Sequence, residues 1–339
     1  MAETEQAAQT LAEMIVSEQL SFFSLDETQT VITKRQGTHP RDDIVWSYSR
    51  REALEQCPRK YYYDYYGANS KTAKNEKDKA ILQQAKHLKN RYLRSGEILH
   101  LVIRTYLKDC QNGKKWSDNG LIEWAKKIFQ EDKEYSSNND SREKQSKQKY
   151  PPTQLLEYHF HHQDAETFYV EAEKRLIRSI SSFVESPELA PFHKGATQPD
   201  AKIEKKFVLQ NGIFRARGQV DLAYSTEETT VIVDWKTGEA GGAEESLQLA
   251  FYGLWAKDEF NRVPDKIQLF RVNLAEGKAQ QFFLTTKSLS QAKAKIMQDL
   301  ERMQMLHSYG VNANAKAFTP CGQTKICALC PFQGICPKE

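Results

Sequence analysis

The sequence lacks any apolar run long enough to cross a bilayer, and its 339 residues carry a formal net charge of only +3. The first absence excludes a helical membrane protein. The second leaves no composition-level signal for nucleic acid, although acids elsewhere can offset a local basic patch. The N-terminus lacks a basic segment followed by an apolar one, so we expect no secretory signal and a cytoplasmic location. The G-x-x-x-x-G-K-[ST] phosphate loop is also absent, which excludes a P-loop ATPase motor within this sequence.

Cysteine is scarce, with six residues in the whole chain. In the cytoplasm we expect thiols or metal and cluster ligands, because disulfides persist mainly in oxidising compartments. Four cysteines stand together in the C-terminal segment CGQTKICALCPFQGICP. A closed zinc site built from Cys321, Cys327, Cys330 and Cys336 is one interpretation, but zinc sites usually combine two separated pairs. Cys57, near the N-terminus, offers another fourth ligand.

The composition of the chain changes along its length and divides it into five segments. A polar N-terminal extension precedes a helical region, a second helical region with a polar loop at 136–152, a strand-rich region and the cysteine-rich tail. Their predicted bounds are 1–45, 46–110, 111–200, 201–310 and 311–339. In the fourth segment, strand-like and helix-like stretches predict the order β-β-β-α-β-β-α. We therefore expect an α/β fold with a mixed β-sheet flanked by helices.

Charged residues converge on two neighbouring strands of that core, in GQVDLAY and VIVDWKTG. A turn centred near residues 227–228 places Asp221 directly opposite Asp234, with their Cβ atoms about 5 Å apart. Lys236 follows Asp234 by two residues and therefore points to the same face. Facing carboxylates repel each other, and a divalent cation such as Mg²⁺ or Mn²⁺ relieves that repulsion. An ion pair on an edge strand is the simpler alternative, but it does not explain why two acids and a lysine converge.

This pattern resembles that of the RecB-type nucleases of the PD-(D/E)XK superfamily, in which G-x-x-D precedes a hydrophobic strand, D-x-K-T-G and Q-x-x-x-Y. The resemblance implies a restriction-endonuclease-like core in which Asp221 and Asp234 bind Mg²⁺ or Mn²⁺ and Lys236 is the catalytic lysine. It also implies that Gln248 and Tyr252, four residues apart on one helical face, belong to the catalytic site and line its DNA-facing side.

The same nucleases carry a histidine metal ligand on a helix well before the hairpin, in a G-x-x-x-H-like context. The segment SGEILH supplies Gly96 and His100 in that order, so the resemblance implies that His100 is a metal ligand. A helical histidine taken alone is more often a structural residue. Glu204, in KIEKKF, stands where the family often has a strand acid. It is a weaker candidate, because a solvated strand charge explains it equally well.

The cysteines resemble a second feature of these nucleases. One group, which includes AddB subunits and the CRISPR-associated Fe–S exonucleases, has a cysteine in an S-x(n)-C-P-R-x-Y/F helix and a terminal C-x2-C-P-x4-C. The resemblance implies that a [4Fe–4S] cluster joins the ends of the chain around the nuclease core. Its ligands would be Cys57, Cys327, Cys330 and Cys336. We expect most tyrosines of RKYYYDYY to pack beside the cluster, with Arg59 and Lys60 free to bind DNA phosphates.

These residues together favour a metal-dependent DNA nuclease with a structural iron–sulfur cluster, most simply an exonuclease that acts on single strands or DNA ends. The alternative is a catalytically silent nuclease fold that serves as a DNA-binding scaffold subunit; retention of the histidine, both acids and the lysine argues against it. A zinc-ribbon interaction protein is a third hypothesis, but it leaves the order of these residues unexplained. Because the sequence has no P-loop, we expect processive digestion to need a partner helicase. DNA repair, CRISPR adaptation and phage defence all use this kind of module.

Overall fold

The computed structural model describes residues 44–69, 76–117, 119–138, 150–211, 214–238 and 243–337. The chain divides into two units, Met1–Asp43 and Ile44–Glu339. The predicted N-terminal extension therefore lies, apart from its last two residues, outside the described residues, as does most of the predicted polar loop. No helix in the described part of the chain is long and apolar enough to span a membrane.

A five-stranded sheet organises the second unit, with the strands in the order β1-β2-β3-β4-β5. Strands β3 and β4 are parallel, and the other neighbours are antiparallel. The strands are β1 (Lys202–Asn211), β2 (Phe214–Ser225), β3 (Thr230–Lys236), β4 (Ile267–Asn273) and β5 (Lys278–Phe283). Helix α10 (Ala243–Glu259) and the short η3 (Pro264–Lys266) connect β3 to β4, and α11 (Thr286–Val311) follows β5. The predicted order of strands and helices is confirmed.

The register of the β2–β3 hairpin is also as predicted. Leu222 pairs with Val233 and Ser225 pairs with Thr230, so the next position beyond the ladder sets Asp221 opposite Asp234. All residues of β3 are buried except Lys236, which is half-buried. The apolar run thus fixes the strand in the core, and the charged residues come at the end where the ladder stops.

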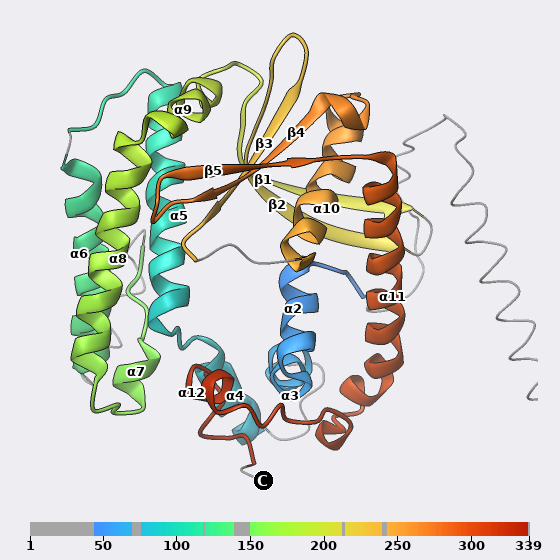
Figure 1. Cartoon of the computed structure of the whole chain (residues 1–339). Coiled ribbons are helices and arrows are strands. Elements are labelled where there is room, and N and C mark those ends of the chain that lie inside the picture. Colours follow the sequence, from blue (N-terminus) through green and yellow to red (C-terminus); the bar gives the residue numbers. More distant parts are fainter. Residues whose placement is uncertain are drawn as a thin grey trace, which may run out of the picture. The chain divides into compact units, whose positions relative to one another are not determined.

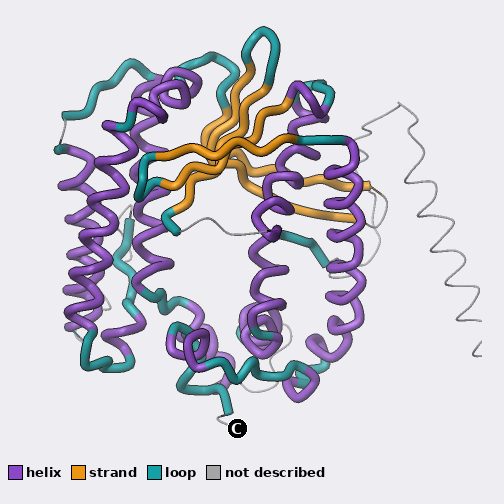
Figure 2. The backbone as a smooth tube through the Cα atoms, viewed as in Figure 1, coloured by secondary structure: helices purple, strands orange, loops and turns teal. Residues whose placement is uncertain are grey.

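Helices cover one face of the sheet as a continuous layer (Figures 1 and 2). Three long helices dominate it, and their apolar faces share a core with Val231, Val233 and Trp235 of β3. The elements are α5 (Arg91–Gln111), α6 (Gly120–Ser137), α7 (Leu156–His159), α8 (Ala165–Glu185), η2 (Pro187–Leu189) and α9 (Ala190–Ala196). The second helical region of the sequence is therefore packed directly on the sheet.

The opposite face is covered by α10, α11 and α2 (Tyr48–Gln56), which share a second core with Ile232 of β3. Phe251 of α10 approaches β2 closely at Gly218, where a Cβ would lie 2.7 Å from the Phe251 ring and 2.5 Å from the Phe207 ring. The glycine of the G-x-x-D motif is thus required by packing. Asp299 of α11 ties α2 to this face, because its carboxylate accepts from Trp46 Nε1 at 3.1 Å and pairs with Arg51.

The ends of the second unit meet through aromatic packing. Elements α3 (Pro58–Tyr62), the π-helix η1 (Tyr63–Gly67) and α4 (Glu76–Lys86) lie beside the tail, which contains η4 (Ala315–Ala317) and α12 (Thr324–Ala328) (Figure 1). The ring centroid of Phe318 lies 5.1 Å from that of Tyr62 and 5.9 Å from that of Tyr66. Phe332 lies 5.1 Å from Tyr63 in the same way. Residues more than 250 positions apart therefore share one core.

Candidate active site

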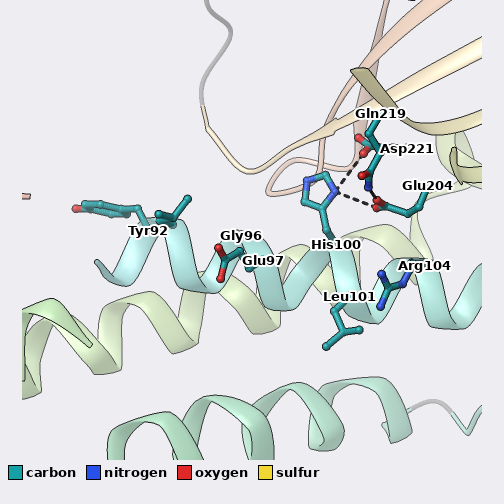
Figure 3. A pocket seen from close by; sticks show the side chains of 10 residues that line it. Tyr92, Gly96, Glu97, His100, Leu101, Arg104, Glu204, Gln219 and Asp221 are labelled. Carbon is teal, nitrogen blue, oxygen red and sulfur yellow. Dashed lines mark hydrogen bonds and ion pairs between the residues drawn. The ribbon is translucent and has the colours of Figure 1, made fainter. Parts of the chain in front are cut away.

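A histidine and two carboxylates converge where α5 meets the β1–β2 strands (Figure 3). His100 Nδ1 lies 3.3 Å from Asp221 Oδ1 and 3.5 Å from Glu204 Oε1. Among the described residues, these three form the only group of three or more histidine, cysteine or acidic side chains whose ligand atoms all lie within 4.8 Å of one another. We call this group the cation site.

Asp221 is held in place by the hairpin. Its Oδ2 accepts a hydrogen bond of 2.7 Å from the backbone N–H of Trp235 on β3, which leaves Oδ1 directed at His100. The bond forms because the β2–β3 ladder ends at Leu222, one residue before the aspartate. The aspartate side chain thus takes the place of a ladder partner, and its orientation follows from the strand register.

Glu204 lies in an unusual stretch of β1. Its neighbours Ile203 and Lys205 pair with Leu222 and Val220, so Glu204 faces Asp221 across a gap in the ladder. Its φ of +53° falls in the left-handed region, which costs a non-glycine residue about 1–3 kcal/mol. The Gln219 amide donates to the second Glu204 oxygen. Backbone and neighbours together therefore turn this carboxylate toward His100, a role that the strand sequence alone indicates only weakly.

The charges of the cation site depend on one another. Burial lowers the pKa of His100, but the Asp221 and Glu204 carboxylates raise it more, so its pKa stands well above the usual value. For Asp221, burial raises the pKa, but the positive charges of His100 and Lys236 and the Trp235 N–H bring it below its ordinary value. A positive charge between the two acids is therefore what stabilises them.

A second set of predicted residues forms a hydrogen-bonded chain beside the cation site. Lys236 Nζ lies 2.8 Å from Asp234 Oδ2 and donates to Gln248 Oε1 at 3.0 Å. Gln248 Nε2 in turn donates to the Tyr252 hydroxyl at 2.7 Å. Tyr252 is only 5% exposed, so its hydroxyl orients Gln248 from inside the protein, whereas we had expected it to face DNA.

Asp234 stands between the two groups. Burial raises its pKa to about 6; Lys236 acts to lower that pKa and Asp221 to raise it further. For Lys236, burial lowers the pKa, but Asp234 and Asp221 raise it more, so the ammonium group keeps its proton. Asp234 is not part of the 4.8 Å donor group, in which Glu204 takes the third position that the sequence analysis assigned to Asp234.

The donor chemistry of the cation site fits a divalent metal ion. The buried Asp221 carboxylate, the partly buried Glu204 carboxylate and one imidazole offer oxygen and nitrogen ligands of the kinds used by Mg²⁺, Mn²⁺ and related ions. Two facing acids in a buried setting need positive charge nearby, and a cation supplies it. The site opens to a hollow of about 490 Å³ along α5, which gives a substrate access to it.

The cysteines approach one another without forming a single-ion site. Cys57 is 7% exposed at the start of α3, and Cys330 and Cys336 pack against the same core. The pKa of the Cys330 thiol is raised to about 12, mainly by burial, with smaller contributions of the same sign from Cys57 and Cys336. Cys321 Sγ lies 4.0 Å from Cys327 Sγ. In the part of the chain that the structure describes, no three sulfurs lie within 4.8 Å of one another.

The two basic residues after Cys57 differ in exposure. Arg59 is 9% exposed, and its Nε donates to the Phe318 carbonyl at 2.7 Å. The expectation of a free Arg59 was wrong, because the guanidinium satisfies a carbonyl of the tail in the interior. Lys60 is more accessible, with 27% of its side chain exposed and Nζ at 3.8 Å from Asp64 Oδ2.

The model of the PD-(D/E)XK nuclease superfamily matches residues 45–337, and the chain belongs to this superfamily. Among solved structures, a protein described as a candidate exonuclease from Eubacterium rectale is similar at 11% identity, with a TM-score of 0.38, over 90% of this chain and 96% of that one. The protein SSO0001 is similar at 18% identity, with a TM-score of 0.29, over 54% of this chain and 78% of its own. No curated protein sequence matches the chain.

Proposed function

We propose that this protein is a divalent-metal-dependent deoxyribonuclease that hydrolyses phosphodiester bonds in single strands or at DNA ends. The observation that carries the proposal is the meeting, at one end of a buried hairpin, of the cation site with a protonated lysine. His100, Glu204 and Asp221 supply the donors, and Lys236 supplies the fixed positive charge. Membership of a nuclease superfamily supplies the class of reaction.

The cation site would hold Mg²⁺ or Mn²⁺, with Asp234 close enough to interact with Asp221 electrostatically. When bound, the ion acidifies water and offsets negative charge on a phosphate under attack. The gap in the β1–β2 ladder keeps the Glu204 and Asp221 carboxylates directed at the same point before any ion arrives. Preorganised ligands of this kind cost little rearrangement at the moment of reaction.

Lys236 has the features of a group that stabilises charge on the phosphate. Its raised pKa keeps it protonated, so it donates hydrogen bonds and does not accept a proton. Asp234 and Gln248 fix its position from two sides, and Tyr252 is a positioning residue that acts through Gln248. A phosphodiester oxygen beside Lys236 would therefore meet a fixed ammonium group as negative charge develops.

We further propose that Cys57, Cys327, Cys330 and Cys336 hold a [4Fe–4S] cluster. Support comes from the burial of Cys57, from the packing of Cys330 and Cys336 against one core, and from the electrostatic influence of Cys57 and Cys336 on Cys330. Thiols that resist ionisation in a buried setting become thiolates when a positively charged metal centre binds them.

Digestion of duplex DNA would draw on a partner helicase, since the sequence has no P-loop. Such a nuclease would serve DNA repair, CRISPR adaptation or phage defence.

The proposal is tested with end-labelled single-stranded, duplex and circular DNA in Mn²⁺, Mg²⁺ or a chelator. We expect cleavage of linear DNA that requires the metal and starts at an end. Asp234→Ala and Lys236→Ala should each lower kcat at least about 10²–10³-fold while DNA binding persists. Lys257→Ala, which alters an exposed lysine of α10, is the matched control and should behave as wild type. Full activity of the Asp234 and Lys236 variants would disprove the assignment.

A further inference from the structure

A row of side chains on α5 extends from the cation site along the surface of the protein (Figure 3). Tyr92, Gly96, His100 and Arg104 recur every four residues, so they form one ridge of the helix, and all four line the hollow that contains Asp221 and Glu204. The ridge is about 18 Å long at 1.5 Å per residue. The opposite side of α5 is buried in the core. The hollow therefore continues well beyond the three donors of the cation site.

Tyr92 provides an exposed aromatic surface at one end of the ridge. Its side chain is 46% exposed, although Arg91 lies over the ring, with its guanidinium carbon 4.4 Å from the centroid. Arg91 also donates to the Tyr92 hydroxyl at 3.2 Å and pairs with the buried Glu157 at 2.9 Å. The ring is thus held by a fixed cation while much of it stays open to solvent. An open, positively backed ring is suited to stacking with a nucleic-acid base.

Gly96 leaves space between Tyr92 and His100. Glycine is unfavourable inside a helix, so its presence needs a reason. Packing within the protein is not that reason, because a Cβ at Gly96 would have no atom within 4 Å. The missing side chain instead keeps the ridge low midway along the roughly two turns that separate the aromatic ring from the cation site. A ligand can therefore lie against the helix backbone there.

The charges around the ridge favour a phosphate chain. Arg104 lies one turn beyond His100, and no hydrogen bond or ion pair is found for it among the described residues. The carboxylate of Glu97, the acid beside the ridge, is neutralised by Lys89 Nζ at 2.9 Å and by Arg94 at 3.4 Å. Positive groups thus stand at both ends of the ridge, and the cation would stand between them.

We propose that this ridge binds a single strand of DNA, with an unpaired base stacked on Tyr92 and the backbone passing over Gly96 to the cation site and Arg104. The proposal rests on the proposed nuclease function and specifies its substrate. Only an unpaired base can leave its neighbours and cover the Tyr92 ring, whereas the bases of a duplex are stacked and paired. The single strand is therefore the form of DNA that the ridge fits.

Binding measured by fluorescence anisotropy in a chelator tests the stacking. Tyr92→Ala should weaken binding of a labelled oligothymidine about tenfold and leave the weaker binding of a hairpin duplex unchanged. Tyr92→Phe should bind as wild type, because it keeps the ring. Tyr309→Ala is the matched control, since Tyr309 of α11 is similarly exposed at 49%. Unchanged single-strand binding by Tyr92→Ala, or equal losses for duplex and single strand, would overturn the proposal, as would tighter binding of oligouridine RNA.

Gly96→Leu tests the backbone path with a variant that should fold. Leucine favours helices and the site is open, so the melting temperature should stay the same or rise while single-strand binding falls about tenfold or more. Wild-type binding by this variant would overturn the path. These binding assays need no cleavage. If Tyr92→Ala and Gly96→Leu weaken binding but neither the wild type nor the variants cut DNA in Mn²⁺, only the nuclease assignment fails. If the wild type cuts DNA and both variants bind it normally, only the proposed strand path fails.

Discussion

The cation site and the meeting point of the chain ends both bring distant residues together, but they prepare their ligands differently. At the cation site, hydrogen bonds and strand register direct the donor atoms of His100, Glu204 and Asp221 to one point. At the chain ends, aromatic packing around Phe318 and Phe332 brings the segments together, and the thiols stay more widely spaced. The first site is thus built by backbone geometry before an ion binds. At the second, packing brings the segments together but does not set the cysteine sulfurs in a single-ion arrangement among the described residues.

The largest effect is expected from Cys57→Ser, which should break the link between the chain ends. The protein purified without oxygen should lose its roughly four irons per chain. Opening so long a loop should also lower the free energy of unfolding by about 4 kcal/mol. Iron and sulfide analysis, together with urea unfolding, measures both effects. Cys321→Ser is the matched control and should keep iron and stability. Iron loss in Cys321→Ser alone would show that the fourth ligand is Cys321, and stoichiometric zinc in a colourless protein would exclude the cluster.

A smaller effect is expected from Glu204→Gln, which tests whether the preformed donor group defines the metal ligands. The substitution should weaken Mn²⁺ binding, measured by calorimetry, at least about tenfold. Glutamine has nearly the shape of glutamate but lacks the negative charge that binds the ion. Glu228→Gln, an exposed glutamate in the hairpin turn, should bind Mn²⁺ normally. If Asp234→Asn weakens Mn²⁺ binding more than Glu204→Gln does, then Asp234 is the third metal ligand, as expected from the sequence. The position of Glu204 beside His100 and Asp221 would then not identify it as a ligand.

The smallest effect is a pH dependence of the metal-free protein. The pKa of Asp234 is raised by burial to about 6, so the folded protein binds more protons than the unfolded chain between about pH 4 and 6. The free energy of unfolding should therefore fall by about 1–2 kcal/mol as the pH rises through this window. Mn²⁺ favours the ionised acid, so its thermal stabilisation should be larger at pH 7.5 than at pH 5.

Asp234→Asn is the comparison for this pH series, because it removes the titrating carboxyl. The metal-free stability of this variant should lose the decline between about pH 4 and 6, while the raised pKa of His100 causes a separate decline of the same sign above pH 6.5. An identical slope in wild type and Asp234→Asn would contradict the shifted pKa.

The hairpin was predictable because its information is local. A continuous apolar run defines β3, a short turn sets the register, and period two puts Asp234 and Lys236 on one face. Glu204 was not predictable with the same strength, since its role depends on a left-handed backbone inside a strand and on the neighbouring strand. Arg59 was misjudged for a related reason. Its partner is the carbonyl of Phe318, 259 residues away, and no local pattern indicates that contact.

The exposed side of α5 shows the same limit. The segment SGEILH indicated His100 through its context, but Tyr92 and Arg104 gained a role only when the helix was seen as a ridge facing the hollow. Likewise, Tyr252 matched a motif position, whereas its burial decides that it supports Gln248. Spacing can thus indicate which residues share a face, but packing determines which of them a substrate can reach.

The contact between the chain ends also sets an order of events during synthesis. Trp46 and Arg51 leave the ribosome early, yet their partner Asp299 follows some 250 residues later, and Phe318 comes later still. Helices α2 and α3 are therefore made first and covered last. Until the tail emerges, the tyrosines of α3 and η1 lack the Phe318 and Phe332 rings that pack on them in the folded protein. A chain that stops short of the tail cannot complete this core, so the second unit is whole only once Phe318 and Phe332 have been made.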